Sequence, residues 1–334
     1  MKHTLTTSIF KVGLLSMFMV MVSCSEDDNS MMPDDMGGND DDDEMVEGRR
    51  AELYVTNNDN GDITKFDITN DTQLTIGTSS TAAEGIYYDA SEDLVIQASR
   101  SNNWLESFDV TDLLDVDLSL DISFNGDADL ESPRELAVYG DYYVVADNGS
   151  NRFFVYQKTG TMFSLQTTVD VPFPVWGITF KGGDLYAVVD ISSDLAVYYN
   201  FLDKAMDGTM YPDKRVTIEG IVRTHGLTYS GSDDVMVMTD IGDAANTDDD
   251  GGFHIINDFS LKFDALSDGD VLTTDNQIRV AGSSTLMGNP IDVAYDSETD
   301  VVYVSDIGTS KVLGFSSIGS GGNIAPTFNV DLTA

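Results

Sequence analysis

Short apolar strands alternate with polar turns from residue 51 to the end of the chain, and this pattern repeats. The unit is a pair of strands around a polar turn, as at residues 53–66, where Leu-Tyr-Val-Thr is followed by Asn-Asn-Asp-Asn-Gly-Asp and then by Ile-Thr-Lys-Phe. Apolar and polar residues that alternate in short runs between such turns predict β-strands. Further copies lie at residues 94–108, 143–156, 185–198, 302–315 and, around an inserted loop, 235–256.

The turns of successive copies are separated by 42, 48, 43 and 50 residues and, across the inserted loop, by 66 residues. Periods of about 40 to 50 residues are typical of four-stranded propeller blades. A further apolar strand precedes five of the copies, and we expect these five to be the innermost strands: residues 84–88, 134–138, 176–180, 225–229 and 291–295. An outer strand is expected after each hairpin, for instance at 164–169 and 279–281. The polar residues that open the six turns are Asn57, Ser99, Asp147, Asp190, Asp240 and Asp306.

The first copy differs from the others because no apolar strand precedes Leu53. The last copy is followed by a predicted outer strand at 327–332, where the chain ends. The pattern predicts an all-β, six-bladed β-propeller of four-stranded antiparallel blades over residues 49–334, with a seventh or an incomplete blade as alternatives. Residues 54–57 read Tyr-Val-Thr-Asn, and the chain from about residue 50 onward resembles the NHL and YVTN families of propeller repeats.

Asp or Asn opens five of the six turns, which raises the question of a functional ring. Short carboxylate and amide side chains at the end of a strand commonly accept backbone N–H bonds and hold a tight turn. We therefore interpret these positions as structural.

The residues that begin the inner strands are the candidates for a ligand site. Inner strands line the central channel of a propeller, and concave regions of this kind are where ligands bind. A carboxylate, a guanidinium, an indole and an imidazole converging there would suit a polar ligand or a sugar. The alternative is structural, with Arg134 paired to Glu135, Trp176 in the core and a buried structural histidine. The candidates are Glu84, Arg134, Trp176, His225 and Asp292.

A metal-dependent hydrolase, lactonase or lyase is the alternative function. Glu84-Gly85 resembles the first metal-ligand motif of the regucalcin and gluconolactonase family, which implies a divalent metal in the channel. The later Asn-Gly and Asp-Gly motifs of that family are replaced here by His225-Gly226 and Ile291-Asp292. Only Glu84 carries over from the family, and His225 would be the second catalytic candidate.

The inserted loop at 240–252 is rich in carboxylates, the ligands that Ca²⁺ prefers. Its spacing lacks the alternating acidic positions and terminal Glu of an EF-hand. Composition alone makes Ca²⁺ a candidate ion for this loop, with the ligand candidates Asp240, Asp243, Asp248 and Asp250.

The chain is strongly acidic, with 58 Asp and Glu against 17 Lys and Arg and a formal net charge of −41. A nucleic acid needs neutralising cationic side chains, so it is excluded as a partner. The same charge keeps an exported protein soluble and attracts cations.

The first 23 residues have the pattern of a lipoprotein signal peptide. Basic residues surround the start of an apolar run at 12–22, which is shorter than the roughly 20 residues that a spanning helix needs. The run ends at Ser23-Cys24, and residues 21–24 resemble the bacterial lipobox. Cys24 is the only cysteine, so it has no disulfide partner in the chain, and lipidation would explain it.

Residues 24–48 are rich in Asp and Glu, and we interpret them as a disordered, self-repelling tether. An acidic stretch after the lipidated cysteine is similar to the export signal of surface lipoproteins in some Gram-negative bacteria, although it would also serve as a solvated linker. We expect a propeller anchored to the outer membrane through lipid on Cys24 and exposed at the cell surface, with a periplasmic position as the alternative. The favoured function is a binding or scaffolding module for a glycan, a small molecule or a protein.

Overall fold

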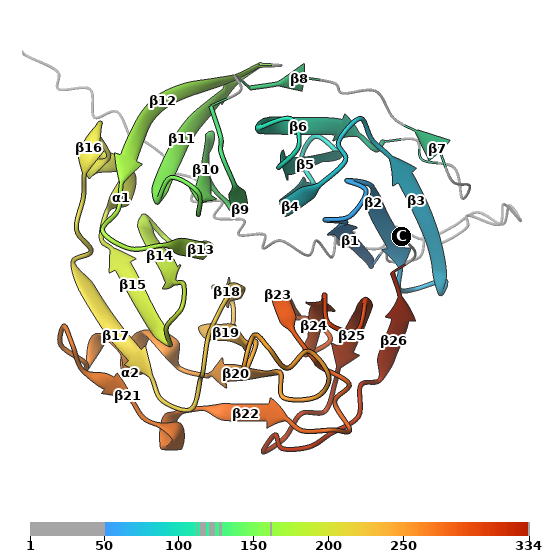
Figure 1. The fold of residues 1–334 in the computed structure, drawn as a ribbon, viewed down its shortest axis with the longest axis vertical. Coiled ribbons are helices and arrows are strands. Elements are labelled where there is room, and N and C mark those ends of the chain that lie inside the picture. Colours follow the sequence, from blue (N-terminus) through green and yellow to red (C-terminus); the bar gives the residue numbers. More distant parts are fainter. Residues whose placement is uncertain are drawn as a thin grey trace, which may run out of the picture.

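The computed structural model describes residues 51–111, 113, 118–119, 124–126, 129–160 and 162–332. Six β-sheets, called blades here and numbered along the chain, are arranged in a ring around a central channel (Figure 1). The predicted six-bladed propeller is confirmed. The predicted signal peptide, Cys24 and the acidic tether lie outside the described residues. Within the described part, no helix has the length and apolar character to cross a membrane.

The strands of the first three blades begin and end as follows. The first blade contains β1 (Glu52–Thr56), β2 (Ile63–Asp67), β3 (Thr72–Gly77) and β7 (Leu118–Ser119). The second contains β4 (Ala83–Asp89), β5 (Leu94–Ser99), β6 (Trp104–Asp109) and β8 (Phe124–Asn125). The third contains β9 (Pro133–Tyr139), β10 (Tyr142–Asp147), β11 (Arg152–Thr159), β12 (Met162–Asp170) and β16 (Gly208–Thr209).

The other three blades include the short helices in their connections. The fourth contains β13 (Val175–Lys181), β14 (Asp184–Val189), β15 (Asp194–Tyr198), β17 (Lys214–Ile218) and β21 (Val271–Leu272). The fifth contains β18 (Leu227–Ser230), β19 (Val235–Asp240), β20 (Gly252–Ile256) and β22 (Ile278–Ala281). The sixth contains β23 (Pro290–Asp296), β24 (Val301–Asp306), β25 (Lys311–Phe315) and β26 (Phe328–Asp331). The helices are α1 (Phe201–Lys204), α2 (Phe259–Asp264) and the 3₁₀ turn η1 (Thr274–Asn276).

The five predicted inner strands are the innermost strands of blades two to six: β4, β9, β13, β18 and β23. Among the described residues, the first blade lacks an inner strand of this kind. Its innermost described strand is β1, which corresponds by the repeat to the second strand of every other blade. The sequence indicated this missing strand, and its position in the ring determines where the candidate site lies.

Short parallel strands connect neighbouring blades and correct the prediction of purely four-stranded antiparallel sheets. The connection after the third strand of one blade reaches back to the outer edge of the blade before it (Figure 1). Thus β7 pairs with β3, β16 with β12 and β21 with β17, while Gly322 bridges Val280 in the same way. Outer strands carry unpaired backbone groups, and these pairings cover part of that edge.

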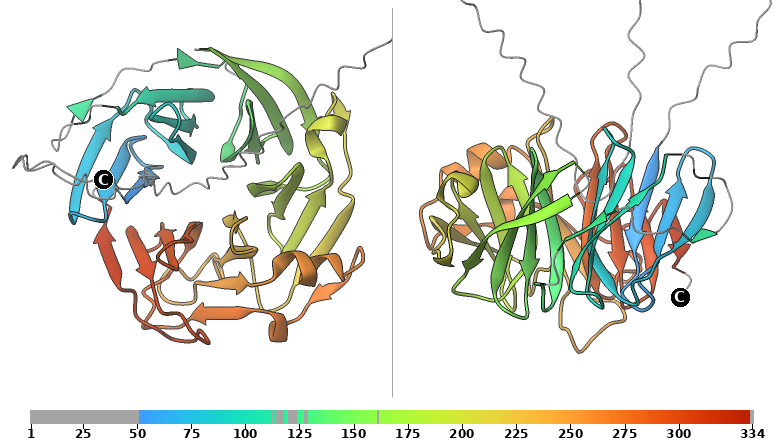
Figure 2. Two further views of the ribbon diagram at one scale, coloured as in Figure 1. Left: turned by 180° about the vertical axis from the view of Figure 1, so that it is seen from behind. Right: turned by 90° about the horizontal axis from the view of Figure 1, so that it is seen from above.

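Apolar side chains fill the spaces between neighbouring blades. Between the fourth and fifth blades, for example, Tyr186 and Val188 pack with Leu227 and Met236, all fully buried. The ring closes between the first and sixth blades, where the C-terminus lies beside the first blade (Figure 2). Closure uses packing rather than a shared strand, because the first and sixth sheets have no strand in common among the described residues. The cluster at this junction is Leu53, Val55, Phe66, Ala294, Tyr303 and Val312.

Candidate functional site

The turn-opening aspartates hold the backbone, as the sequence predicted. Asp147 accepts hydrogen bonds from the N–H groups of Glu131 and Ser132 through one oxygen, at 2.7 and 2.8 Å, and from Ser150 through the other. Asp306 makes the equivalent bonds to Gly288, Asn289 and Thr309. Each carboxylate therefore ties the end of a second strand to the loop that precedes the inner strand.

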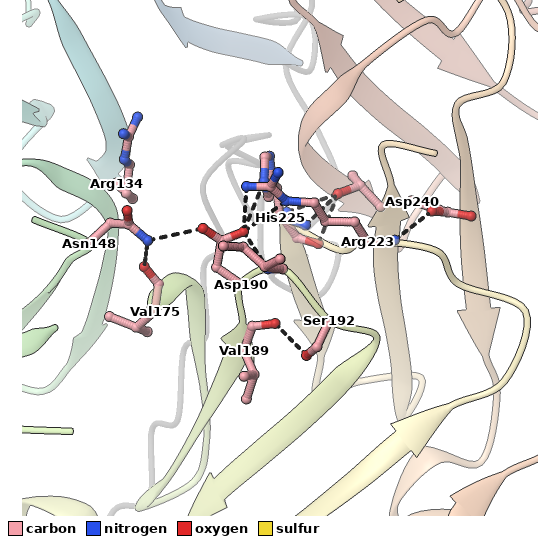
Figure 3. Close-up of polar contacts among 12 residues, drawn as sticks. Arg134, Asn148, Val175, Val189, Asp190, Ser192, Arg223, His225 and Asp240 are labelled. Atoms are coloured by element: carbon pink, nitrogen blue, oxygen red, sulfur yellow. Dashed lines mark hydrogen bonds and ion pairs between the residues drawn. The ribbon is translucent and has the colours of Figure 1, made fainter. Parts of the chain in front are cut away.

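Asp190 occupies the same repeat position and departs from this pattern. Two backbone N–H groups before each of β9, β18 and β23 donate to the turn-opening aspartate, and one of these two positions is taken here by Pro174, which has no N–H to give. Asp190 instead lies 2.7 Å from Nη2 of Arg223 and 3.4 Å from Nε2 of His225, and Asn148 donates to its other oxygen (Figure 3). A structural turn position has become part of a charged cluster at the channel.

Four of the five predicted site residues form one continuous row of contacts. Arg134 Nη1 lies 2.6 Å from Glu84 Oε2, and its guanidinium lies over Trp176 at 4.0 Å from the ring centroid. The Trp176 and His225 rings are parallel, with their centroids 3.7 Å apart. These residues come from four successive blades, so the row follows the channel wall. The expected alternative pairing of Arg134 with Glu135 is wrong, because Glu135 accepts from its neighbour Leu136 instead.

Glycines beside the row allow the inner strands to approach one another. The Gly177 N–H donates to the His225 carbonyl of the next blade at 2.9 Å, and a Cβ at Gly177 would lie 2.4 Å from that oxygen. A Cβ at Gly226 would lie 2.6 Å from the Cα of Asp292. Both distances are far below van der Waals contact. The small residues next to Trp176 and His225 in the sequence therefore determine how closely the blades meet.

The cluster around Asp190 has a defined ionisation state. Burial alone would raise the pKa of Asp190, but His225 and Arg223 together lower that pKa to about 2. Burial lowers the pKa of His225, and its contact with Asp190 opposes this only in part. At neutral pH the pair thus consists of an aspartate charged against Arg223 and a neutral imidazole. A neutral buried imidazole stacked on indole is well suited to fixing the position of Trp176.

A cavity of about 110 Å³ lies beside this row, in the place that an inner strand of the first blade would occupy. Its walls come from β1, β4, β23 and β24, together with Arg134, Glu135 and Trp176. Glu84 and Asp292 both line it, whereas His225 lies behind Trp176 and does not. The structure thus gathers Glu84, Arg134, Trp176 and Asp292 at one concavity and places His225 as their support.

Carboxyl groups dominate the charged side chains of the lining, with five of them against the single cationic side chain of Arg134. Burial raises the pKa of Glu135 well above its usual value, and the nearby charge of Asp292 adds to the effect. Burial likewise raises the pKa of Asp292 to about 7, although the N–H of Val293 bonds to its carboxylate at 2.8 Å. Neither group has an ion-pair partner among the described residues. The five are Asp59, Glu84, Glu135, Asp292 and Asp306.

We expect Asp292→Asn to raise the free energy of unfolding by about 1–2 kcal/mol at pH 8. This is less than the full change in the Asp292 pKa implies, because Asp292 faces the cavity. The folded pKa of about 7 lies above the ordinary value of 3.8, so this group favours folding most below pH 4. That contribution is lost as the pH rises through 7. The asparagine oxygen still accepts from Val293. Urea unfolding at pH 5 and pH 8 measures the change.

The control for this prediction is Asp203→Asn, which removes one exposed carboxylate from α1. The stability of this variant should change with pH as that of the wild-type protein does, because the net charge of this acidic protein also changes with pH. Equal behaviour of the two variants between pH 5 and pH 8 would contradict a raised pKa at Asp292.

The inserted loop does not gather its carboxylates. Asp240 is buried and accepts from the N–H groups of Val222 and Gly242, while Asp250 accepts from the N–H of Asp243. In the described part of the chain, no group of three or more His, Cys, Asp or Glu side chains is placed to hold a metal ion. The candidates Asp240, Asp243, Asp248 and Asp250 therefore gain no support as Ca²⁺ ligands.

The alternative enzymatic site also gains no support from the geometry. Glu84 is held by Arg134 at 2.6 Å and Arg100 at 3.4 Å, and a divalent cation bound to it would meet both guanidinium groups. Its proposed partner His225 is separated from it by Arg134 and Trp176. The two residues therefore do not face a common reacting atom.

Three residues of the site were not found from the sequence. Arg100 and Arg223 lie in turns without any motif, and only the folded ring brings them to Glu84 and Asp190. A signal for Asp190 did exist, since Pro174 removes the backbone donor that the repeat would otherwise provide.

Comparisons with known proteins agree with the fold. No protein-family model matches the chain, and no curated protein matches its sequence. A chain from a solved nidogen/laminin complex is similar over 84% of this chain and 93% of its own length, with a TM-score of 0.57 and 14% identity. A similarity at this low sequence identity shows the fold alone.

Two further solved structures are similar to about the same degree. A putative 6-phosphogluconolactonase from Bacteroides uniformis has a TM-score of 0.53 at 10% identity, covering 86% of this chain and 84% of that one. A chain of Kuenenia stuttgartiensis hydrazine synthase has a TM-score of 0.52 at 12% identity, covering 80% of this chain and 74% of that one. The solved neighbours include both an enzyme-like protein and a binding complex, so the fold does not choose between these functions.

Proposed function

We propose that this protein is a lipid-anchored binding module outside the cytoplasm, and that its propeller binds a ligand with a cationic group in the cavity beside β1. The observation that carries the proposal is the lining of that cavity, which holds five carboxyl groups and one cationic side chain. Two of these carboxyls, Glu135 and Asp292, are desolvated without a partner cation in the described structure. A ligand cation would supply the missing charge.

Aromatic surface at the cavity strengthens the case. Trp176 lines the cavity and is held rigidly between Arg134 and His225. Tyr54 and Tyr303 line it as well. These rings give the cavity apolar walls beside its carboxyl groups, which is the usual composition of a small-molecule site.

The anchor rests on the sequence of residues 1–24 and accounts for the acidic tether as a spacer between lipid and propeller. Mass spectrometry of the mature chain tests it. We expect a diacylglyceryl group on Cys24 at the N-terminus, and an unmodified chain that begins elsewhere would rule the anchor out.

Fluorescence of Trp176 tests the binding site. The chain has two tryptophans, and a Trp104→Phe background leaves Trp176 as the single reporter. Spermidine, a flexible polyamine, and maltotriose, a neutral sugar, are suitable probes. We expect a saturable change in emission with spermidine, with binding weakened at least tenfold by Asp292→Asn and unchanged by Asp203→Asn.

Two results would overturn the proposal. One is the absence of any change in emission or melting temperature with either probe at millimolar concentration. The other is an equal loss of spermidine binding in both variants, since this would indicate general attraction to an acidic surface rather than a site.

A further inference from the structure

Two bulky apolar residues of this protein lie in left-handed turns. Among the described residues, twelve other than glycine have a positive φ; eight are Asp or Asn, which adopt this conformation most readily, and two are Ser. The remaining two are Ile191, with a φ of 59°, and Leu286, with a φ of 65°. Ile191 follows the second strand of the fourth blade and Leu286 precedes the inner strand of the sixth, so both lie on the face that carries the turn-opening aspartates.

Burial does not explain why these two positions hold apolar side chains. Ile191 is 72% exposed and Leu286 is 38% exposed, and Val222, in the loop before β18, is 64% exposed. Single exposed apolar residues are common on protein surfaces. A bulky or β-branched side chain at a positive φ is uncommon, because the conformation is costly for it. A strained position of this kind points to a function for the exposed side chain.

Ile191 and Val222 lie on either side of one ion pair. The Asp190 carboxylate accepts from the N–H of Ile191 at 2.6 Å and from Nε of Arg223 at 2.9 Å, and it lies 2.7 Å from Nη2 of the same guanidinium (Figure 3). Val222 directly precedes Arg223. The two charges neutralise each other, so the apolar side chains beside them form a contact site without a net charge of its own.

The inserted loop connects this site to Leu286. At one end the Ile241 N–H donates to the Arg223 carbonyl at 2.8 Å. Further along, the loop is pressed onto the sixth blade, where a Cβ at Gly288 would lie only 1.9 Å from the Thr247 carbonyl oxygen. The loop projects from the same face of the ring, on the lower side of the right-hand view in Figure 2. It is therefore held in place between the two strained residues.

The charge of the inserted loop determines which partner suits this face. Asp243, Asp248 and Asp249 are exposed, and residues 240–252 contain no Lys or Arg. A second copy of this chain would bring a net charge of −41 against these carboxylates. Residues 24–48 would also be repelled, since they contain eleven Asp and Glu and no Lys or Arg. Charge complementarity favours a partner with basic side chains.

We propose that this face binds a separate protein through a segment that presents aliphatic side chains next to Lys or Arg. The aliphatic side chains would cover Ile191, Val222 and Leu286, and the basic residues would pair with the carboxylates of the inserted loop. Apolar contact would supply the affinity, while the opposite charges would speed association and exclude acidic partners. The surface is separate from the cavity, whose lining includes none of these residues.

A capped, labelled peptide of alternating Leu and Lys is the probe, and fluorescence anisotropy measures its binding to the full mature chain. Two control peptides separate the two kinds of contact. One has Ser in place of every Leu and keeps the charge, and the other has Glu in place of every Lys and keeps the apolar residues. We expect saturable binding of the Leu–Lys peptide and at least about tenfold weaker binding of both controls.

Ile191→Asn tests the strained residue, because Asn is polar and accepts a positive φ more readily than Ile. We expect this variant to bind the Leu–Lys peptide at least about tenfold more weakly, with a melting temperature no lower than that of the wild-type protein. Asp249→Asn should also weaken binding. The matched control is Leu261→Gln, at a leucine of α2 that is 75% exposed, and it should leave the affinity within about twofold.

Four results would overturn the inference. The first is the absence of binding by the Leu–Lys peptide, and the second is equal binding of the Ser–Lys peptide, which would indicate general attraction to an acidic protein. The third is unchanged binding by Ile191→Asn together with a lower melting temperature, since Ile191 would then serve the fold. The fourth is an equal loss of binding in Asp292→Asn, which would place the peptide in the cavity. None of these results depends on whether spermidine binds, so the proposed function is tested separately.

Discussion

Gly177→Ala should lower the free energy of unfolding by about 3 kcal/mol, the upper end of the range for overpacked sites. The new methyl would lie 2.4 Å from the His225 carbonyl and 2.7 Å from Leu227 Cδ2, so the fourth and fifth blades would have to separate. Separation would stretch the hydrogen bond between the two inner strands and disturb the stacking of Trp176 on His225. Urea unfolding measures the loss, and the Trp176 emission reports the stacking.

Gly183→Ala is the matched control, since Gly183 lies in the β13–β14 turn and its new methyl would meet no atom within 4 Å. It should change stability by no more than about 0.5 kcal/mol. If the two variants were equally stable, blade contact at the channel would not depend on the glycine. A loss of stability without any change in Trp176 emission would show that the stacking is independent of blade spacing.

The propeller could be predicted because its hairpins repeat the same sequence of apolar strand, polar turn and apolar strand. The short parallel strands were not predictable in this way. β16 consists of Gly208 and Thr209 alone, and two residues carry no periodicity. Their pairing depends on the outer edge of a neighbouring blade, which only the closed ring places beside them.

The sequence predicted where the candidate site lies, but it did not predict the cavity or the contacts that surround it. Glu84, Arg134, Trp176 and Asp292 begin inner strands, and that position alone brings them to the channel. The cavity lies against β1, which is the innermost strand of the first blade among the described residues. Composition misled the interpretation only in the inserted loop, where Asp240 and Asp250 bond to backbone N–H groups instead of meeting one another.

Asp190→Ala should destabilise the protein by about 2 kcal/mol at pH 7, less than for a fully buried pair because Arg223 is one-quarter exposed. The substitution leaves the Arg223 guanidinium without its carboxylate and removes the contact to His225. The folded pKa of about 2 lies below the ordinary value of 3.8, so Asp190 stabilises the protein above pH 4. This contribution is lost as the pH falls from 4 toward 2.

Asp170→Ala is the matched control, because Asp170 pairs with Arg152 at 2.6 Å with both side chains more than 40% exposed. It should cost no more than about 0.5 kcal/mol. Urea unfolding at pH 7 and at pH 3 separates the two variants: the deficit of Asp190→Ala should shrink at pH 3, whereas that of Asp170→Ala should stay small at both. If Asp190→Ala lost as much free energy of unfolding at pH 3 as at pH 7, Asp190 would act through packing rather than through its charge. The row from Arg134 to His225 would then not depend on an ionised aspartate beside it.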